Sequence, residues 1–240
     1  MGGISVIIPV CGLPEYTGAV LEDIANQTLA PKEILIVDNS RDPYTMGMIP
    51  KFRETLPQLR LYYSSNSFGV NASWNFGFNM VSGNLVSVLN NDLRLPKHFL
   101  EAIQHVFKSD STIGIVVPNT VDSIRKVETA TKQSIRIQDL SMREGWAFTI
   151  RRQILQQIGE IPSELKSFCG DDWIFQKAWA ARHRAVKILS LPIYHYVSRT
   201  VETEGKLPDM KVDCDTWERN IGPTALRWRK APGALYNRKA

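Results

Sequence analysis

The segment Gly83–Leu95, with the sequence GNLVSVLNNDLRL, decides the fold of this 240-residue chain. Its apolar part, residues 85–89, lies between turn-forming residues, which is typical of a buried parallel strand. Asn90, Asn91 and Asp92 follow this strand directly. Because ligands bind at the carboxyl ends of strands in open α/β sheets, we expect these side chains in a ligand-binding crevice. The Asp92 carboxylate suits Mg²⁺ or Mn²⁺ carrying a diphosphate, although a polar strand end that caps the next helix has the same pattern.

Apolar runs alternate with helical periodicity on both sides of this segment. Further buried strands are predicted at residues 4–10, 33–37, 59–63 and 113–117, and helices at 14–28, 44–56 and 96–107. Pro50 is expected to break the second of these helices or to mark its start. This order predicts an α/β fold of Rossmann-like type, with a mostly parallel central sheet and helices on both faces.

The pattern changes after Pro118. Residues 123–140 are polar with short alternating stretches, which indicates a hairpin or a mobile loop. The remaining elements are predicted as strands at 145–150, 186–189 and 193–196 and as helices at 151–158 and 173–182. Residues from Thr200 onward change from acidic-polar to basic and are expected to form a tail or a cover.

Composition restricts the environment and the partners of the chain. No apolar run reaches the roughly 18 residues that a membrane-spanning helix needs, and Met1 leads almost directly into a strand, so we expect no signal peptide. The three cysteines show neither metal-ligand spacing nor a disulfide framework, which favours a reducing cytoplasm. The net charge is +5, and residues 219–240 carry basic and aromatic side chains without acids. Such a segment suits a nucleic acid, an anionic membrane surface or an acidic polymer, or it is a solvated terminus.

Two strand ends bear on the class of ligand. The loop after the first strand, Cys11–Pro14, is not Gly-x-Gly-x-x-Gly, which argues against a dinucleotide-binding fold. Asp38 follows the second strand, where its carboxylate can accept a hydrogen bond from a nucleotide base or ribose. An Asx turn or a helix cap is the structural alternative for this aspartate.

Further candidate residues lie on helices and late strands. Asn71, Trp74 and Asn75 either face the site or pack their helix, and Gly69 and Gly77 either permit close approach to a ligand or only lower helix propensity. The acids Asp171 and Asp172 precede a helix, where they either cap it or provide a general base. His195 lies on an alternating strand, opposite the neighbouring tyrosines, as a structural residue or a metal ligand.

These pieces together resemble family-2 glycosyltransferases with the A-type fold. The matching pieces run in the family's order from about residue 4 to residue 198: Val6–Val10, Ile36–Ser40, Asn66 to Gly77, Leu89–Asp92, Gly145–Arg152, Gly170–Asp172 and His195. The resemblance implies a nucleotide-sugar-binding half at residues 1–118 and an acceptor-binding and catalytic half of the same domain at 119–198. Residues 199–240 are then a basic C-terminal extension.

The resemblance also implies a role for each matching residue. Pro9 and Val10 line the base pocket, and Asp38 binds the base or ribose. Residues 90–92 take the place of the family's Asp-x-Asp motif, in which Asp92 holds the divalent ion. The implied donor site also includes Asn66, Gly69, Asn71, Asn75, Asn90, Asn91 and Trp146.

The catalytic roles follow from the same resemblance. His195 is similar to the family's late metal or diphosphate ligand, Asp172 to its general base, and Asp171 to the acid that orients the acceptor or the helix start. The implied reaction is transfer of a sugar from a nucleoside-diphosphate sugar, with UDP-sugars first, to an acceptor hydroxyl, with inversion and with Mn²⁺ or Mg²⁺ as the cofactor. The acceptor is a saccharide, a lipid-linked glycan or a modified nucleic acid, and the location is cytoplasmic or peripheral to a membrane.

Two other functions compete with this interpretation. A sugar-phosphate nucleotidyltransferase has a similar sheet, but it normally carries a Gly-rich loop with Arg and Lys after the first strand, which Cys11–Glu15 lacks. A non-catalytic nucleotide-sugar-binding protein is the second alternative, because a fold does not guarantee activity. The acids at 92 and 172 and the histidine at 195 favour an enzyme.

Overall fold

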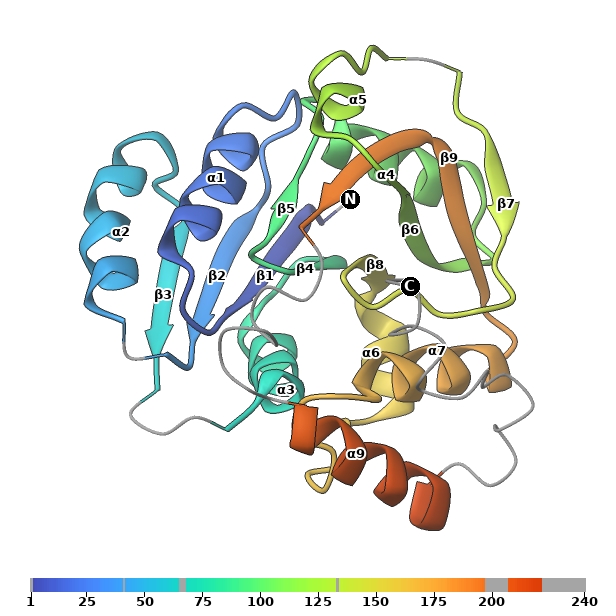
Figure 1. The fold of residues 1–240 in the computed structure, drawn as a ribbon. Coiled ribbons are helices and arrows are strands. Elements are labelled where there is room, and N and C mark those ends of the chain that lie inside the picture. Colours follow the sequence, from blue (N-terminus) through green and yellow to red (C-terminus); the bar gives the residue numbers. More distant parts are fainter. Residues whose placement is uncertain (1, 41, 65–67, 133, 197–206, 222–240) are drawn as a thin grey trace.

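The computed structural model describes residues 2–40, 42–64, 68–132, 134–196 and 207–221 (Figure 1). Its first four long strands form a parallel arrangement in the order β3-β2-β1-β4. These strands are β1 (Ile4–Val10), β2 (Glu33–Asp38), β3 (Leu59–Tyr63) and β4 (Leu85–Leu89). β1, β2 and β4 are buried almost throughout, as the apolar runs predicted.

The second half of the same sheet is mixed. β8 (Ala147–Arg151) lies between β4 and β6 (Ile113–Val121) and is antiparallel to both. β9 (Arg184–His195) runs parallel to β6, and the short strands β5 (Leu93–Arg94) and β7 (Ile137–Asp139) both pair antiparallel with β9. The β5–β9 pairing brings Asp92 and His195 into one region, because Leu93 lies opposite His195.

Helices cover both faces of the sheet, as predicted. One face carries α1 (Pro14–Ala25), α2 (Pro43–Thr55) and α4 (Phe99–Ser109). The other carries α3 (Val70–Met80), α6 (Arg152–Ile158), α7 (Gly170–Ala180) and Trp217 of η1 (Trp217–Ile221). α9 (Leu207–Thr216) lies below α6 and α7 in the view of Figure 1, and its Asp213 hydrogen-bonds the segment that precedes α7. None of the described helices is long and apolar enough to cross a membrane.

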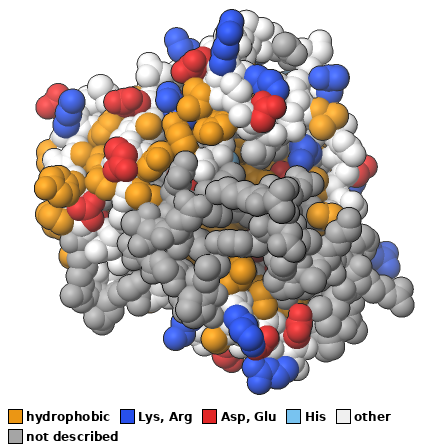
Figure 2. Space-filling view, in the orientation of Figure 1, with side chains coloured by type: hydrophobic (Ala, Val, Ile, Leu, Met, Phe, Trp, Pro, Cys, Tyr) orange, Lys and Arg blue, Asp and Glu red, His pale blue; other side chains and the backbone are white. Residues whose placement is uncertain are grey.

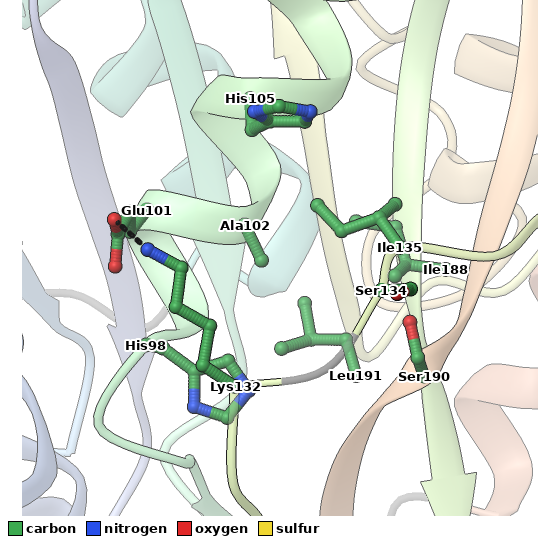
Figure 3. Close-up of a pocket in the computed structure, with 10 residues that line it drawn as sticks. All are labelled: His98, Glu101, Ala102, His105, Lys132, Ser134, Ile135, Ile188, Ser190 and Leu191. Atoms are coloured by element: carbon green, nitrogen blue, oxygen red, sulfur yellow. Dashed lines mark hydrogen bonds and ion pairs between the residues drawn. The ribbon is translucent and has the colours of Figure 1, made fainter.

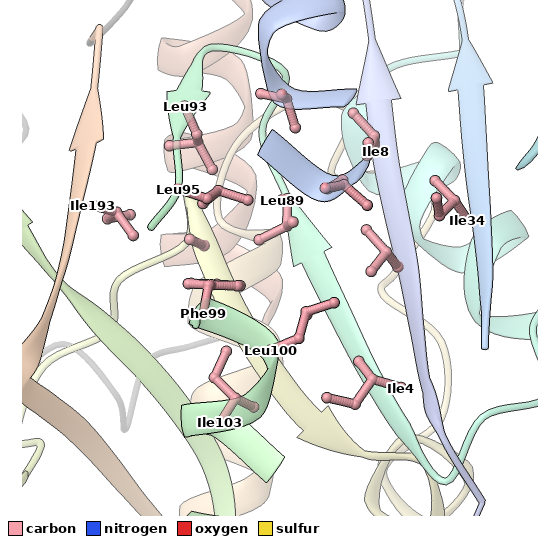
Figure 4. Close-up of a cluster of buried hydrophobic side chains, with 14 of the residues drawn as sticks. Ile4, Ile8, Ile34, Leu89, Leu93, Leu95, Phe99, Leu100, Ile103 and Ile193 are labelled. Carbon is pink, nitrogen blue, oxygen red and sulfur yellow. The ribbon is translucent and has the colours of Figure 1, made fainter. Parts of the chain in front are cut away.

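The alternation of side chains along each strand produces two cores. Ile4 and Ile8 of β1 contribute to the core under α1 and α4, whereas Ile7 contributes to the core under α3 and α7. Figure 4 shows the first core, in which Phe99 and Leu100 of α4 lie close to Leu89. Hydrophobic side chains also lie on the surface. Figure 2 shows them over the side of the molecule where α1 and α2 lie.

Pro50 neither breaks α2 nor starts it. The helix runs continuously through this residue. Its N-terminus is capped by the Asp42 carboxylate, which accepts hydrogen bonds from the backbone N–H groups of Tyr44 and Thr45. Ile49 packs into the core, and capping together with packing offsets the one backbone hydrogen bond that a proline removes.

Two further predictions were wrong in part: separate strands at residues 186–189 and 193–196, and a hairpin or mobile loop at residues 123–140. β9 is one continuous strand, because Pro192 sits at an irregularity in the β6–β9 register, where a missing N–H group is tolerated. Residues 123–140 contain the short helix α5 (Ile124–Glu128) and the edge strand β7, which pairs with β9. This pairing joins residues far apart in sequence, which local periodicity does not report.

Candidate active site

The predicted base-binding residues meet at the carboxyl ends of β1 and β2. Val10 lies opposite Asp38 in the parallel register, with Pro9 opposite Val37. The backbone N–H of Asn39 donates to the carbonyl of Val10 at 2.9 Å, which fixes the two strand ends together. Pro9, Val10 and Asp38 therefore lie in one small region, as the strand pattern predicted.

The Asp38 carboxylate is fully buried and bonded on one side only. Oδ1 accepts hydrogen bonds from the Ser40 backbone N–H at 2.7 Å and from the Ser40 hydroxyl at 2.5 Å. Oδ2 is buried and accepts no hydrogen bond within the described part of the chain. Burial raises the pKa of Asp38, and the two Ser40 bonds oppose that rise. A buried acceptor of this kind is costly unless a ligand donates to it.

The three polar residues after β4 have different environments. The backbone N–H of Asn90 donates to the carbonyl of Trp146 at 2.9 Å. The Asn91 amide donates to the Gly12 carbonyl at 3.2 Å and to the Thr17 hydroxyl at 3.0 Å, so it holds the loop that starts α1. Asn91 was predicted to bind the donor, but in the structure its amide serves this loop contact.

Asp92 and His195 form a buried pair. His195 Nε2 lies 3.1 Å from Asp92 Oδ1, and the two side chains are 11% and 6% exposed, respectively. The Trp146 ring stacks on the imidazole, with centroids 5.6 Å apart and planes inclined by 19°. The Trp146 indole N–H donates to the Thr120 hydroxyl at 2.8 Å, which fixes the ring in this position.

This pair suits a divalent ion that a substrate helps to bind. Within the described residues, no group of three or more His, Cys, Asp or Glu side chains is placed to hold a metal. One carboxylate and one imidazole supply two ligands. Mg²⁺ and Mn²⁺ accept such sets when phosphate oxygens and water complete the coordination. The donor set therefore fits a diphosphate-bridging ion better than a permanently held one.

The two acids lie in the first turn of α7 and share one arginine. Arg143 Nε is 2.5 Å from Asp172 Oδ1, and Arg143 Nη1 is 3.2 Å from Asp171 Oδ2. Burial raises the pKa of Asp171, the Arg143 guanidinium opposes this, and the neighbouring Asp172 adds to it. Cys169 precedes the helix with a φ of 62°, in the left-handed region.

The dipeptide Gly145–Trp146 joins these two groups. A Cβ atom on Gly145 would lie 2.5 Å from Asp171 Oδ2, so the acid packs directly on this glycine. The next residue, Trp146, stacks on His195. One member of the acid pair and one member of the Asp92–His195 pair therefore contact adjacent residues, whose Cα atoms are about 3.8 Å apart.

Two asparagines of α3, Asn71 and Asn75, hydrogen-bond the segment that precedes the acids of α7. The Asn71 amide donates to the carbonyls of Leu165 and Phe168 at 3.0 and 2.9 Å, and Asn75 exchanges two hydrogen bonds with the backbone of Ile161. In the structure these asparagines have supporting contacts, and the donor-binding role predicted for them stays a prediction. They hold the segment that leads into the acids.

The other predicted residues of this region also pack the fold. Trp74 is buried against Phe148, and a Cβ on Gly77 would lie 2.7 Å from the Ile7 side chain. Gly77 thus permits close helix–strand packing instead of approach to a ligand. Gly69 has a φ of +85° and lies against the Lys166 carbonyl. Asn66 lies outside the described residues.

Two supporting residues were missed by the sequence analysis. Asp213 of α9 is 1% exposed, and its carboxylate accepts hydrogen bonds from the backbone N–H groups of Lys166, Ser167 and Phe168 at 3.1, 2.7 and 2.7 Å. Arg143 is the other. Both residues lie in segments without periodicity, so only their charge marked them in the sequence.

A pocket of about 270 Å³ lies elsewhere, between α4, residues 132–135 and β9 (Figure 3). Its lining includes His98, His105, Ser190 and the Lys132–Glu101 ion pair. None of the predicted site residues lines it. The candidate site is therefore the group at the strand ends, not this pocket.

Comparisons with known proteins point to one family. The sequence model described as glycosyl transferase family 2 matches residues 5–179. The uncharacterized glycosyltransferase alr2836 of Nostoc sp. is 24% identical over 172 residues, which cover 65% of this chain and 52% of the relative. The chain therefore spans about half the length of this relative.

Solved structures share the fold at low sequence identity. S. aureus TarS 1–349 in complex with UDP-GlcNAc has a TM-score of 0.65 at 20% identity, over 80% of this chain and 58% of that one. The mannosyltransferase PcManGT of Pyrobaculum calidifontis, in complex with GDP-Man and Mn²⁺, has a TM-score of 0.67 at 19% identity, over 98% and 67%. These likenesses establish an A-type glycosyltransferase fold for the chain.

Proposed function

Because the chain belongs to glycosyl transferase family 2, we propose that it transfers a sugar from a nucleoside-diphosphate sugar to an acceptor hydroxyl, with inversion at the anomeric carbon. The observation that supports this most is the Gly145–Trp146 dipeptide: Asp171 of the acid pair packs on Gly145, and His195 of the Asp92–His195 pair stacks on Trp146. A diphosphate-binding pair beside a general base is the arrangement that such a transfer needs.

The donor nucleotide is assigned to the ends of β1 and β2. Pro9 and Val10 form the wall of the base pocket, and Asp38 Oδ2 accepts a hydrogen bond from the base or ribose. UDP-sugars are the first candidates. The relatives of known structure were solved with UDP-GlcNAc in one case and GDP-Man in another, so GDP-sugars are the second candidates.

The diphosphate is assigned to Asp92 and His195, which would hold Mn²⁺ or Mg²⁺ together with it. When bound, such an ion stabilises the charge that develops on the departing diphosphate. Asn90 stands where the family's motif has its first acid, which removes one negative charge and one strong ligand from the site. Trp146 stacks on the imidazole, and it is proposed to lie near the donor or acceptor sugar, on which an aromatic face can stack.

Asp172 is the proposed general base. Its carboxylate takes the proton of the acceptor hydroxyl while the acceptor oxygen forms a bond to the anomeric carbon. The bond from that carbon to the diphosphate oxygen breaks in the same step, and the nucleoside diphosphate leaves with the electron pair. One displacement inverts the anomeric centre, so no protein nucleophile is required. Asp171 is proposed to orient either the acceptor or the start of helix α7.

The acceptor is proposed to be a saccharide or a lipid-linked glycan, with a modified nucleic acid as a third candidate. The basic segment that suggests the nucleic acid lies mostly outside the described residues. If DNA or RNA is the acceptor, binding should weaken steeply with salt and should drop when residues 223–240 are deleted. Binding that ignores salt would remove this candidate.

The central test uses nucleotide sugars and one variant. A panel of UDP-, GDP- and dTDP-sugars with Mn²⁺ is screened first by thermal stabilisation and then by release of the nucleoside diphosphate. Asp172→Asn should abolish transfer and leave donor binding nearly unchanged. Unchanged turnover would remove Asp172 as the base, and binding of a nucleotide sugar without any turnover of the wild-type protein would identify a binding protein instead.

A further inference from the structure

Arg143 contacts both acids of the candidate site with different nitrogen atoms. Its Nε lies 2.5 Å from Asp172 and its Nη1 lies 3.2 Å from Asp171. Adjacent carboxylates repel each other, and one shared guanidinium reduces their combined charge from −2 to −1. The two nitrogens belong to one rigid planar group, so the position of each carboxylate is tied to that of the other through ion-pair contacts with this group.

The surroundings hold Arg143 in place. Its side chain is only 30% exposed, and the pKa of Arg143 is raised mainly by Asp171, against the effect of burial. The next residue, Glu144, forms an ion pair with Lys187 of β9. After it, Gly145 lies under the Asp171 carboxylate. Three successive residues thus contact charged groups of α7 or β9.

We propose that Arg143 is a positioning residue of the transfer reaction: its guanidinium lies against both acids, offsets their charge and aims the Asp172 carboxylate at the acceptor hydroxyl. Asp171 has a second function in this arrangement, because it anchors the other side of the guanidinium. The inference rests on the proposed function, in which Asp172 is the base. The charged or titratable groups around the bridge are Asp171, Asp172, Cys169, Glu144 and Lys187.

Opposite charge changes should move the pH profile of kcat/KM in opposite directions. Arg143→Met removes the cation, which makes protonation of the acid pair easier, so the ascending limb should move to higher pH by about one unit. Asp171→Asn removes a neighbouring negative charge, so the limb should move to lower pH. Arg143→Met should also lower kcat about 10- to 100-fold through misorientation of the base.

Arg143→Lys separates charge from geometry. Lysine restores the cation without the planar fork, so the limb should return toward the wild-type pH while kcat stays reduced. Arg184→Met is the matched control, because Arg184 also bridges two aspartates, Asp110 and Asp139, away from the candidate site. It should leave the pH profile unchanged. Thermal unfolding and donor affinity of each variant show whether the fold is intact.

The outcomes distinguish this inference from the proposed function. If the wild-type protein turns over no nucleotide sugar, the proposed function fails. If Asp172→Asn retains activity, Asp172 is not the base and Arg143 has no base to position. If Asp172→Asn is inactive but Arg143→Met lowers kcat without moving the limb, Arg143 is only structural and the inference is overturned. Shifts of Arg143→Met and Asp171→Asn in the same direction also overturn it.

Discussion

The Asp38 carboxylate combines full burial with one oxygen that accepts no hydrogen bond in the described part of the chain. Leaving a buried acceptor unsatisfied costs about 1–3 kcal/mol. The Ser40 hydroxyl and N–H already occupy Oδ1, which leaves Oδ2 for a ligand. We therefore expect Asp38 to lower the stability of the protein without ligand and to favour binding of a ligand that donates a hydrogen bond to Oδ2.

Asp38→Asn tests this residue as a ligand acceptor. The amide oxygen must accept the two Ser40 hydrogen bonds, so the NH₂ group faces the ligand, where an acceptor stood before. We expect UDP affinity to fall about 10- to 100-fold, measured by calorimetry, since two donors then face each other. Asp42→Asn, at the N-cap of α2, is a nearby control and should bind UDP normally. Unchanged affinity of the Asp38 variant would place the base elsewhere.

The same variant should be more stable than the wild type at neutral pH. Burial raises the pKa of Asp38 in the folded protein. A carboxyl with a raised pKa contributes stability below its unfolded pKa and loses it as pH rises through the folded one. The stability advantage of Asp38→Asn should therefore appear at pH 7 and shrink toward pH 4, as measured by urea unfolding without ligand. An advantage that grows at low pH would contradict this sign.

The Asp92–His195 pair gives a prediction about metal. Asp92→Asn and His195→Ala should each reduce the thermal stabilisation that Mn²⁺ produces together with UDP, because each removes one of two proposed ligands. His183→Ala is the control, since His183 hydrogen-bonds Gln157 away from the pair. If both site variants keep the full Mn²⁺-dependent shift, the ion is held elsewhere.

At the scale of elements, the segment 161–168 is held between two helices. Asn71 and Asn75 of α3 bind it from one side, and the Asp213 carboxylate of α9 accepts three of its backbone N–H groups. Cys169 follows directly, with its sulfur 3.9 Å from that of Cys214. Contacts with α9, a helix late in the chain, therefore hold the segment that leads into the two acids of α7.

Asp213→Ala should loosen this segment. Losing an acceptor for three N–H groups should lower the free energy of unfolding by about 1–3 kcal/mol. kcat should fall while UDP affinity stays the same, because the base pocket lies on β1 and β2. Asp215→Ala on the same helix is the matched control, since that carboxylate is half-exposed and pairs with Lys211. Equal losses of kcat and UDP affinity would point to general unfolding.

The elements also show what the sequence could predict. The apolar runs of β1, β2 and β4 follow local patterns, so these strands were predicted correctly. The roles of the acids at 92, 171 and 172 stay predictions. The continuity of β9 through Pro192, the pairing of β7, and the contacts of Arg143 and Asp213 depend on partners distant in sequence. Hydrophobic periodicity contains no information about such partners, so these features required the structure.

At the scale of the whole molecule, one sheet carries both parts of the proposed reaction. The parallel strands β1 and β2 provide the nucleotide end, and the mixed half around β8 and β9 provides Trp146 and His195. The division into halves at residue 118 stays a prediction. β6, which contains that position, pairs with both β8 and β9 and so belongs structurally to the second half.

The place of β8 has a consequence for synthesis on the ribosome. β4 is complete at Leu89, but its neighbour on the far side ends only at Arg151. A nascent chain of intermediate length therefore displays the bare backbone edge of an apolar strand, which invites pairing with other chains. Fragments that stop between these two residues should aggregate, and a fragment that includes Arg151 covers the edge of β4 with β8.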